Sequence, residues 1–106
     1  MAILTKETIL DYMSKMKSRL KNDGIDEIGL FGSYAKDNAD TNSDIDIILL
    51  TNSKFLEKFG GLGSFAYLDK LRLKISNKFK KSVDICTTSS AKKLQDDFFK
   101  DAIYAR

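Results

Sequence analysis

Histidine and proline are absent from the 106 residues, and cysteine occurs once, as Cys86. Without histidine the chain cannot build a Ser-His-Asp or Cys-His nucleophilic centre, an imidazole metal site or a histidine general base. A single cysteine cannot form an intrachain disulfide, and it lacks the partners that a zinc site needs. Any chemistry must therefore use carboxylates, hydroxyls, lysines and a metal ion.

Long hydrophobic runs are also absent. No segment approaches the roughly 18 apolar residues of a membrane span, and the first residues lack the basic-then-apolar order of a signal peptide. A composition of 42% hydrophobic and 31% charged residues excludes collagen-like, low-complexity and disordered chains. We therefore expect a cytoplasmic protein that does not contact a membrane, with a single domain over residues 1–106.

The hydrophobic periodicity predicts an α/β fold class, with a small mixed sheet of three or four strands flanked by helices and carrying the site at one edge. Helical spacing begins after Thr5 and continues to residue 22, and β-prone runs cover residues 25–31, 44–50 and 81–88. Ser53 is expected to cap a short helix that ends at Phe59. The remaining segments are interpreted as a flexible glycine-rich connector at 60–64 and two helices at 65–79 and 89–105.

Charge is distributed unevenly along the chain, although the net charge is only +3. Residues 70–81 contain six basic side chains and no acidic one, whereas carboxylates are concentrated in residues 37–46. A basic face beside an acidic pocket would suit a polyanion held with divalent cations, but a solvated helix face explains the same pattern. Direct nucleic-acid binding is not expected, because no aromatic residues are interleaved with the basic ones as a stacking surface requires.

Asp44 and Asp46 flank Ile45 in a predicted strand, so the period of two places both carboxylates on one face. Aspartate is disfavoured in strands, and two neighbouring carboxylates repel each other unless a cation lies between them. Oxygen ligands without histidine or cysteine select Mg²⁺ or Mn²⁺ over zinc. The alternative is that Asp44 caps a turn and Asp46 lies on a solvated face.

Gly32 and Ser33 follow an apolar strand and open a predicted helical turn. Glycine allows close approach to the backbone, and the free N–H groups at a helix start form an anion site together with a serine hydroxyl. Phosphate is the expected occupant. An isolated Ser33 would be read as a helix N-cap, but here an Asp-x-Asp pair follows ten residues later.

The segment LFGSYAKDNADTNSDIDIILL resembles the signature of the polymerase-β-like nucleotidyltransferase superfamily. Within it, the short chain resembles the minimal nucleotidyltransferases (the MNT group), which often partner HEPN toxins. The resemblance covers essentially the whole chain, and it matches Asp84, in KSVDICTT, to the third aspartate of the family. It implies transfer of AMP from ATP to a hydroxyl, with a tyrosine of a HEPN toxin as the acceptor and an antitoxin role.

The same resemblance implies a role for each site residue. Asp44, Asp46 and Asp84 would be the catalytic residues and would bind two Mg²⁺ ions. The nucleotide phosphates would bind to Gly32, Ser33 and Lys36. Both a homo-oligomer and a hetero-oligomer with the partner remain open.

Two positions depart from the family pattern Gly-Ser-x-Ala-Arg-Gly: Lys36 replaces the arginine and Asp37 replaces the last glycine. A lysine keeps the charge but not the bidentate geometry, and Asp37 adds a negative charge near the expected triphosphate. Two alternative functions follow from the sequence. One is a catalytically weak antitoxin that acts by binding alone, and the other is a small RNA-binding module that uses the basic helix.

Overall fold

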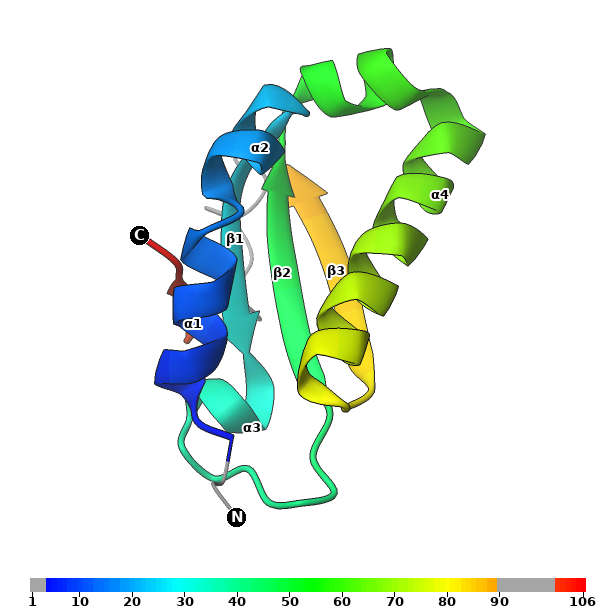
Figure 1. Cartoon of the computed structure of the whole chain (residues 1–106). Coiled ribbons are helices and arrows are strands. Elements are labelled where there is room, and N and C mark those ends of the chain that lie inside the picture. Colours follow the sequence, from blue (N-terminus) through cyan, green and yellow to red (C-terminus); the bar gives the residue numbers. More distant parts are fainter. Residues whose placement is uncertain (1–3, 90–100) are drawn as a thin grey trace.

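Four strands of the computed structural model, which describes residues 4–89 and 101–106, form one mixed sheet in the order β3-β2-β1-β4 (Figure 1). The central pair β1 and β2 is antiparallel, β3 runs parallel to β2, and β4 runs antiparallel to β1. The mixed α/β class predicted from the sequence is confirmed. The strand bounds are Ile25–Phe31 (β1), Ile45–Thr51 (β2), Val83–Ser89 (β3) and Ile103–Tyr104 (β4).

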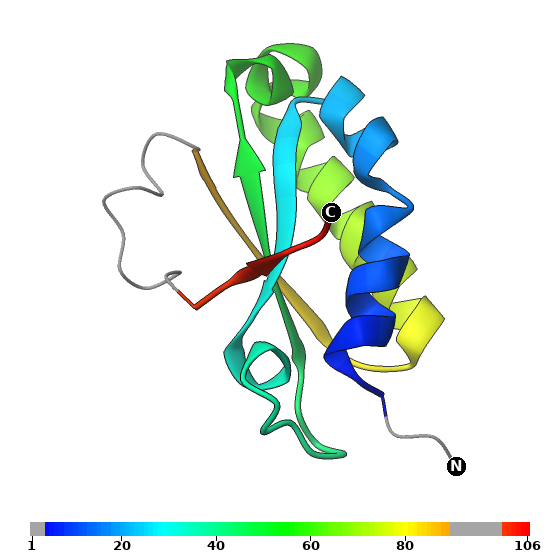
Figure 2. The ribbon, with the colours of Figure 1, turned by 90° about the vertical axis from the view of Figure 1, so that its left-hand side faces the viewer.

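Three helices cover one face of this sheet: α1 (Lys6–Ser14), α2 (Lys17–Asn22) and α4 (Ser53–Phe79) (Figure 2). The short helix α3 (Gly32–Ala35) follows β1 directly and lies at the end of the sheet where β2 and β3 begin (Figure 1). No helix formed by the described residues combines the length and the apolar character needed to cross a membrane.

The main core lies between the helices and the sheet, because alternate residues of each strand point to the helical face. β2 contributes Ile45, Ile47 and Leu49, each fully buried, and these pack with apolar residues of α1, α2 and α4. The helical spacing of apolar residues predicted over 5–22 is confirmed in part, because Ile9, Met13, Met16 and Leu20 are all buried.

The opposite face of the sheet carries a smaller apolar cluster, in which Ile48 and Leu50 pack with Phe31, Ala102 and Tyr104. Gly29 permits this packing, because a Cβ built there would lie 2.7 Å from a ring carbon of Tyr104. Asp46 is next to Ile48 on the same face, since residues two apart in a strand share a face.

The N-terminal helical segment begins as predicted but is divided in two. The side chain of Thr5 caps α1 by accepting a hydrogen bond from the Thr8 N–H at 3.3 Å. The chain then turns at Lys15 and Met16, where the Met16 N–H donates to the carbonyl of Met13, before α2 begins. The break lets both short helices pack against β1.

The short helix predicted to end at Phe59 does stop there, because Gly60 breaks the helical geometry, but the flexible connector predicted at 60–64 is wrong. α4 runs from Ser53 to Phe79, and within it only Gly60 leaves helical geometry, at φ 70° and ψ −176°. Packing between the two limbs explains this, because Tyr67 lies on Phe59 and Phe55 with ring centroids 4.6 and 5.3 Å apart. The helix is also capped one residue earlier than predicted, by Asn52 instead of Ser53.

The helix predicted over residues 89–105 is wrong at its C-terminal end. Ile103 and Tyr104 form β4 and pair with Leu30 and Gly29 of β1, because the outer edge of β1 offers unsatisfied backbone groups. Residues 90–100 of that predicted helix lie outside the described residues.

Candidate active site

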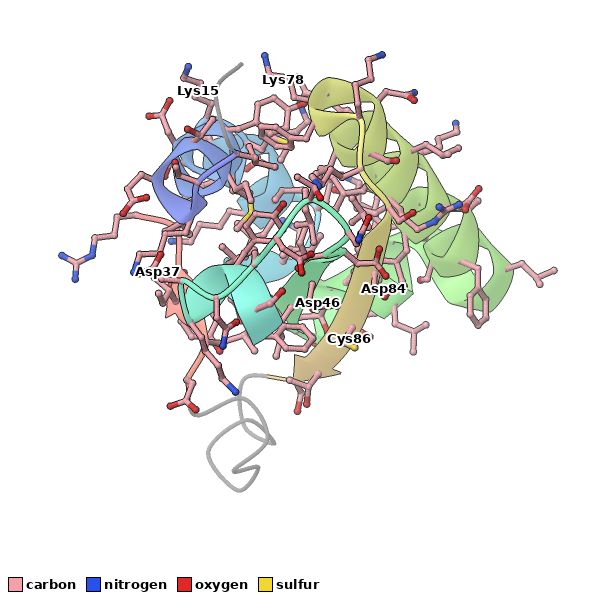
Figure 3. The ribbon with its side chains drawn as sticks, turned by 90° about the horizontal axis from the view of Figure 1, so that it is seen from below. Lys15, Asp37, Asp46, Lys78, Asp84 and Cys86 are labelled. Carbon is pink, nitrogen blue, oxygen red and sulfur yellow. The ribbon has the colours of Figure 1, made fainter. Side chains whose placement is uncertain are left out.

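The antiparallel pairing of β1 with β2 and the parallel pairing of β2 with β3 bring two predicted site residues together. Asp46 lies opposite Phe31 of β1 and opposite Asp84 of β3. Residues in register on neighbouring strands point to the same face, and neighbouring strands lie about 4.8 Å apart. Asp46 and Asp84 are therefore adjacent on the face of the sheet opposite the long helices (Figure 3).

Gly32 lies directly over Asp46, where β1 ends and α3 begins. Its φ of +71° is in the left-handed region, and a Cβ at this position would collide with the Asp46 carboxylate. The left-handed φ favours glycine here, and any side chain would have to displace the Asp46 carboxylate. The Gly-Ser and Asp-x-Asp motifs, which are separated by a loop in the sequence, thus meet at a single point.

The environment of Asp46 disfavours its negative charge. Burial raises the pKa of this carboxyl above its ordinary value of 3.8, and the nearby carboxylates of Asp84 and Asp44 raise it further. The negative charges of Asp84 and Asp44 therefore both oppose ionisation of Asp46, and a bound cation would favour it.

A cleft of about 370 Å³ opens beside Asp46. Its walls are formed by Phe31, Gly32, Lys36, Asp46, Asp101 and Ala102. Lys36, the predicted phosphate ligand, therefore shares a cavity with Gly32 and Asp46. Asp101 was not singled out from the sequence, because it falls inside a segment that reads as an amphipathic helix. Asp101 lies at the cleft because the strand β4, which begins two residues later, pairs with β1.

The remaining predicted residues lie at the margins of the site. Asp44 is exposed and immediately precedes β2, while Ser33 is partly exposed in α3 and Asp84 is exposed near the start of β3. Across residues 4–89 and 101–106, no three His, Cys, Asp or Glu side chains lie close enough together to hold a metal ion.

Asp37, the unexpected acid of the motif, faces away from the cleft. Lys6 of α1 forms an ion pair with it at 2.7 Å, and both residues line a separate pocket between α1 and α3. Asp37 has a φ of 59°, a left-handed conformation in which aspartate is among the better tolerated residues after glycine. The family's glycine therefore falls at a left-handed position that Asp37 can adopt.

The donor set of this site is suited to a hard divalent cation, because Asp44, Asp46 and Asp84 offer only oxygen atoms. Mg²⁺ prefers such ligands and commonly keeps several waters. A cation bound by two of these carboxylates would complete its coordination from water or from a bound phosphate group.

A mixed sheet that places paired carboxylates beside a glycine at a strand-to-helix turn is the arrangement expected of a nucleotidyltransferase fold. Residues 4–105 match the family described as "Polymerase beta, Nucleotidyltransferase", and the chain belongs to that family. The resemblance seen in the sequence is confirmed at this level.

Among solved structures, the fold is similar to that of a protein from Sulfolobus solfataricus reported as a "putative nucleotidyltransferase" at 1.40 Å resolution. The two chains are 17% identical, with a TM-score of 0.50, over 90% of this chain and 77% of the other. At this identity the likeness concerns the fold alone. No curated protein sequence matches the chain.

Proposed function

We propose that this protein is a metal-dependent adenylyltransferase that moves AMP from ATP to a hydroxyl group. The observation that carries the proposal is the position of Asp46, which lies under Gly32 and in register with Asp84. Family membership supports the reaction class. The hydroxyl acceptor, the choice of adenine as the nucleobase and the requirement for a metal ion are parts of this proposal.

The cleft beside Gly32 would hold the triphosphate. Lys36 lines this cleft, and its ammonium group would neutralise phosphate charge as a point charge. Gly32 and Ser33 would place backbone N–H groups and a hydroxyl against the β- and γ-phosphates. The ion pair of Asp37 with Lys6 keeps that carboxylate out of the cleft and removes it as an obstacle to triphosphate binding.

Asp46 and Asp84, which are in register on neighbouring strands, would hold Mg²⁺, and Asp44 would join them as a further ligand once its exposed side chain turned toward the pair, since the three carboxylates do not form a metal-ligand cluster as they stand. When bound, the metal supplies electrostatic stabilisation of the attacking and leaving oxygens in an in-line displacement. Burial and then the carboxylates of Asp84 and Asp44 raise the pKa of Asp46, and a bound cation would oppose these effects.

In the transfer step, the acceptor oxygen forms a bond to the α-phosphorus, and the bond between that phosphorus and the bridging oxygen breaks. Pyrophosphate leaves with the electron pair. Asp84 is exposed on the edge strand, where an acceptor could reach it, and its carboxylate would take the proton from the acceptor hydroxyl.

The acceptor we propose is a tyrosine hydroxyl of a HEPN-type toxin, which would make this chain its antitoxin. The support is the resemblance of the Gly32 to Asp46 segment to minimal nucleotidyltransferases. Asp84 is exposed on the edge strand β3, a position that would suit a macromolecular acceptor.

The test is an assay with purified protein, Mg²⁺, ATP labelled on its α-phosphate, and a co-expressed HEPN-type partner protein. Mass spectrometry of the partner should show added AMP, and EDTA or Asp46→Asn should abolish it. Asp69→Asn is the matched control, since Asp69 is exposed on α4 and, within residues 4–89 and 101–106, pairs only with Arg72. A partner that is neutralised without any gain in mass would support the antitoxin that acts by binding alone.

A further inference from the structure

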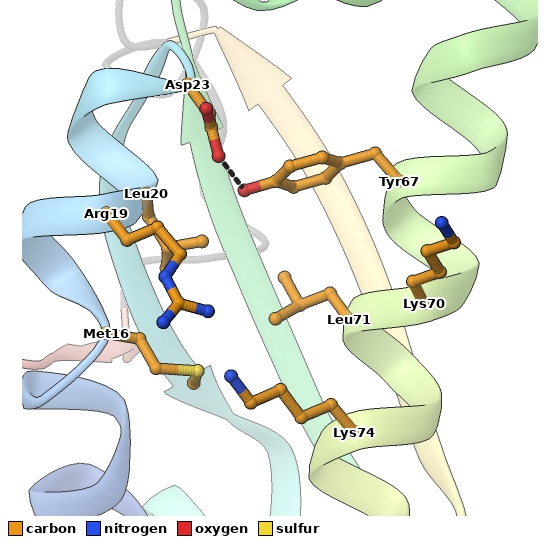
Figure 4. A pocket seen from close by; sticks show the side chains of 8 residues that line it. All are labelled: Met16, Arg19, Leu20, Asp23, Tyr67, Lys70, Leu71 and Lys74. Carbon is orange, nitrogen blue, oxygen red and sulfur yellow. Dashed lines mark hydrogen bonds between the residues drawn. The ribbon is translucent and has the colours of Figure 1, made fainter.

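A second pocket lies on the helical side of the sheet, between α2 and α4 (Figure 4). It measures about 180 Å³, close to a cavity that holds one benzene-sized group. Its lining residues are Met16, Arg19, Leu20, Asp23, Tyr67, Lys70, Leu71 and Lys74. None of them belongs to the candidate active site, which lies on the opposite face.

The floor of this pocket is apolar. Met16 and Leu20 come from the α1–α2 side and Leu71 from α4, and all three belong to the main core. A thioether and two branched side chains attract an apolar group but offer it no hydrogen bond. The floor therefore fits a single aliphatic or aromatic side chain.

The rim of the pocket is cationic. Arg19 reaches over the floor from α2 and Lys74 from α4, so that their charged ends point toward each other, and Lys70 lies one turn away (Figure 4). None of these three cations takes part in the ion pairs formed among the described residues. Like charges that face each other around a cavity favour an anion between them.

Asp23 is the one carboxylate among the lining residues, and its oxygens are already engaged. Lys58 donates to it at 2.7 Å and Tyr67 at 2.8 Å. Although burial raises the pKa of Asp23, these hydrogen bonds and nearby cations outweigh burial and lower it overall. Asp23 closes one end of the pocket, where its charge acts on Arg19 as well as on Lys58, and among the described residues Lys70 and Lys74 have no carboxylate paired with them.

The pocket is poorly suited to nucleic acid, which binds basic grooves by stacking bases on exposed rings. Tyr67 is the one aromatic residue in the lining. Its ring packs against Phe55 and Phe59, and its hydroxyl is held by Asp23. An acidic peptide segment matches both parts of the pocket, because its carboxylates can pair with the rim while one apolar side chain fills the floor.

We propose that this pocket is the docking site for an acidic segment of a protein partner, anchored by one apolar side chain. This goes beyond the proposed transfer reaction, since the pocket and Asp46 are on opposite faces of the sheet. A partner held here would leave the active site open.

The probe is a fluorescent eight-residue peptide of glutamates and aspartates with one central leucine, titrated against the full chain by anisotropy. Chemical shifts of the labelled protein should change in α2 and the second limb of α4. Replacing the leucine by alanine should weaken binding about five-fold or more, because a buried apolar side chain is lost. Replacing the acids by lysine should abolish it.

The double reversal Arg19→Glu with Lys74→Glu should weaken binding about ten-fold or more, since attraction becomes repulsion at two rim positions. The matched control is Lys21→Glu with Lys54→Glu, which changes net charge equally at exposed positions outside the pocket and should change binding less than two-fold. Circular dichroism establishes that both variants are folded. Mg²⁺-dependent ATP binding should be the same in both.

Several outcomes would overturn the proposal. Equal loss of affinity in the two variants would mean that the peptide senses only net charge. Affinity that does not depend on the leucine, together with tighter binding of a single-stranded RNA of equal charge, would assign the surface to nucleic acid. No binding of the peptide at millimolar concentration would leave the pocket without the proposed occupant.

Discussion

Replacing Asp46 by asparagine tests whether the carboxylates share one site. In the folded chain, burial, Asp84 and Asp44 raise the pKa of Asp46 above its value of 3.8. The folded state therefore holds the proton more tightly than the unfolded chain does. The contribution of the protonated Asp46 carboxyl to the stability of the fold is fully present below about pH 3.8. It is lost as the pH rises through the raised pKa of this group. At neutral pH, Asp46→Asn should make the metal-free protein more stable.

The magnitude follows from the register of the strands. Charges about 5 Å apart repel by roughly 3 kcal/mol at an effective dielectric of 20 and by about 0.8 kcal/mol in water. Asp84 is exposed, so solvent screening places the expected relief near the lower figure, at about 1 kcal/mol. In a domain of this size that corresponds to an increase of about 4–8 °C in Tm.

The assay is calorimetry of the metal-free protein between pH 3 and pH 8, with and without Mg²⁺ and ATP. The gain from Asp46→Asn should disappear toward pH 3, and Asp84→Asn should share about 1 kcal/mol of coupling with it in a double-mutant cycle. Ligand at 100 times its Kd should add about 2.7 kcal/mol to the native chain and little to the variant. If Asp46→Asn melts lower at pH 7 and still gains from Mg²⁺ with ATP, the shared site is refuted.

Two further substitutions and one measurement of thiol reactivity probe the turn, the phosphate contact and the edge strand. Gly32→Ala should lower Tm by about 8 °C or more, because it adds left-handed strain and a collision with Asp46, whereas Gly61→Ala, with open space around it, should be neutral or stabilising by thermal melting. Lys36→Arg should lower the apparent KM for ATP a few-fold in steady-state kinetics, and an unchanged KM would remove Lys36 from the phosphates. Burial, Asp46 and Asp84 raise the pKa of Cys86, so its reaction with a disulfide reagent should be slow at pH 8 and faster in Asp46→Asn; equal rates would contradict this.

The strands and the acidic pair were predictable because their signals are local. The run at 25–31 coincides with β1, and the strand predicted at 44–50 differs from β2 by one residue at each end. Aspartate at two alternate positions before a wholly apolar run conflicts with strand propensity, and such conflicts mark sites that serve a function. The family assignment follows from these residues and is confirmed.

The break at Gly60 was predictable from the glycine-rich run, but the helix that resumes directly after it and the strand β4 were not, since both depend on contacts that the local pattern does not contain. Glycine lowers helix propensity, but the packing of Tyr67 on Phe59 holds the limbs of α4 in place around Gly60. Tyr104 extends the sheet because Gly29 leaves space for its ring on the neighbouring strand. Neither contact leaves a trace in the local pattern. Whether Asp101 contributes to the cleft likewise depends on where β4 pairs.

The ten-residue interval between the Gly32-Ser33 motif and the Asp44-x-Asp46 motif has a structural reason. Phe31 pairs with Asp46, so the chain from Gly32 onward forms one closed loop that returns to the strand it left. Within this loop, the Asp40 N–H donates a hydrogen bond to the Ser43 hydroxyl, which in turn donates to the Asp40 carboxylate. From outside the loop, Lys81 donates to the carbonyl of Thr41 at 2.8 Å. A shift of one residue in the β1–β2 register would turn Asp46 toward the helices and replace it at the site by an isoleucine. The pairing of Gly32 with the Asp46 carboxylate thus requires both the loop closure and the register, which is why spacing and residue types together carried the sequence signal.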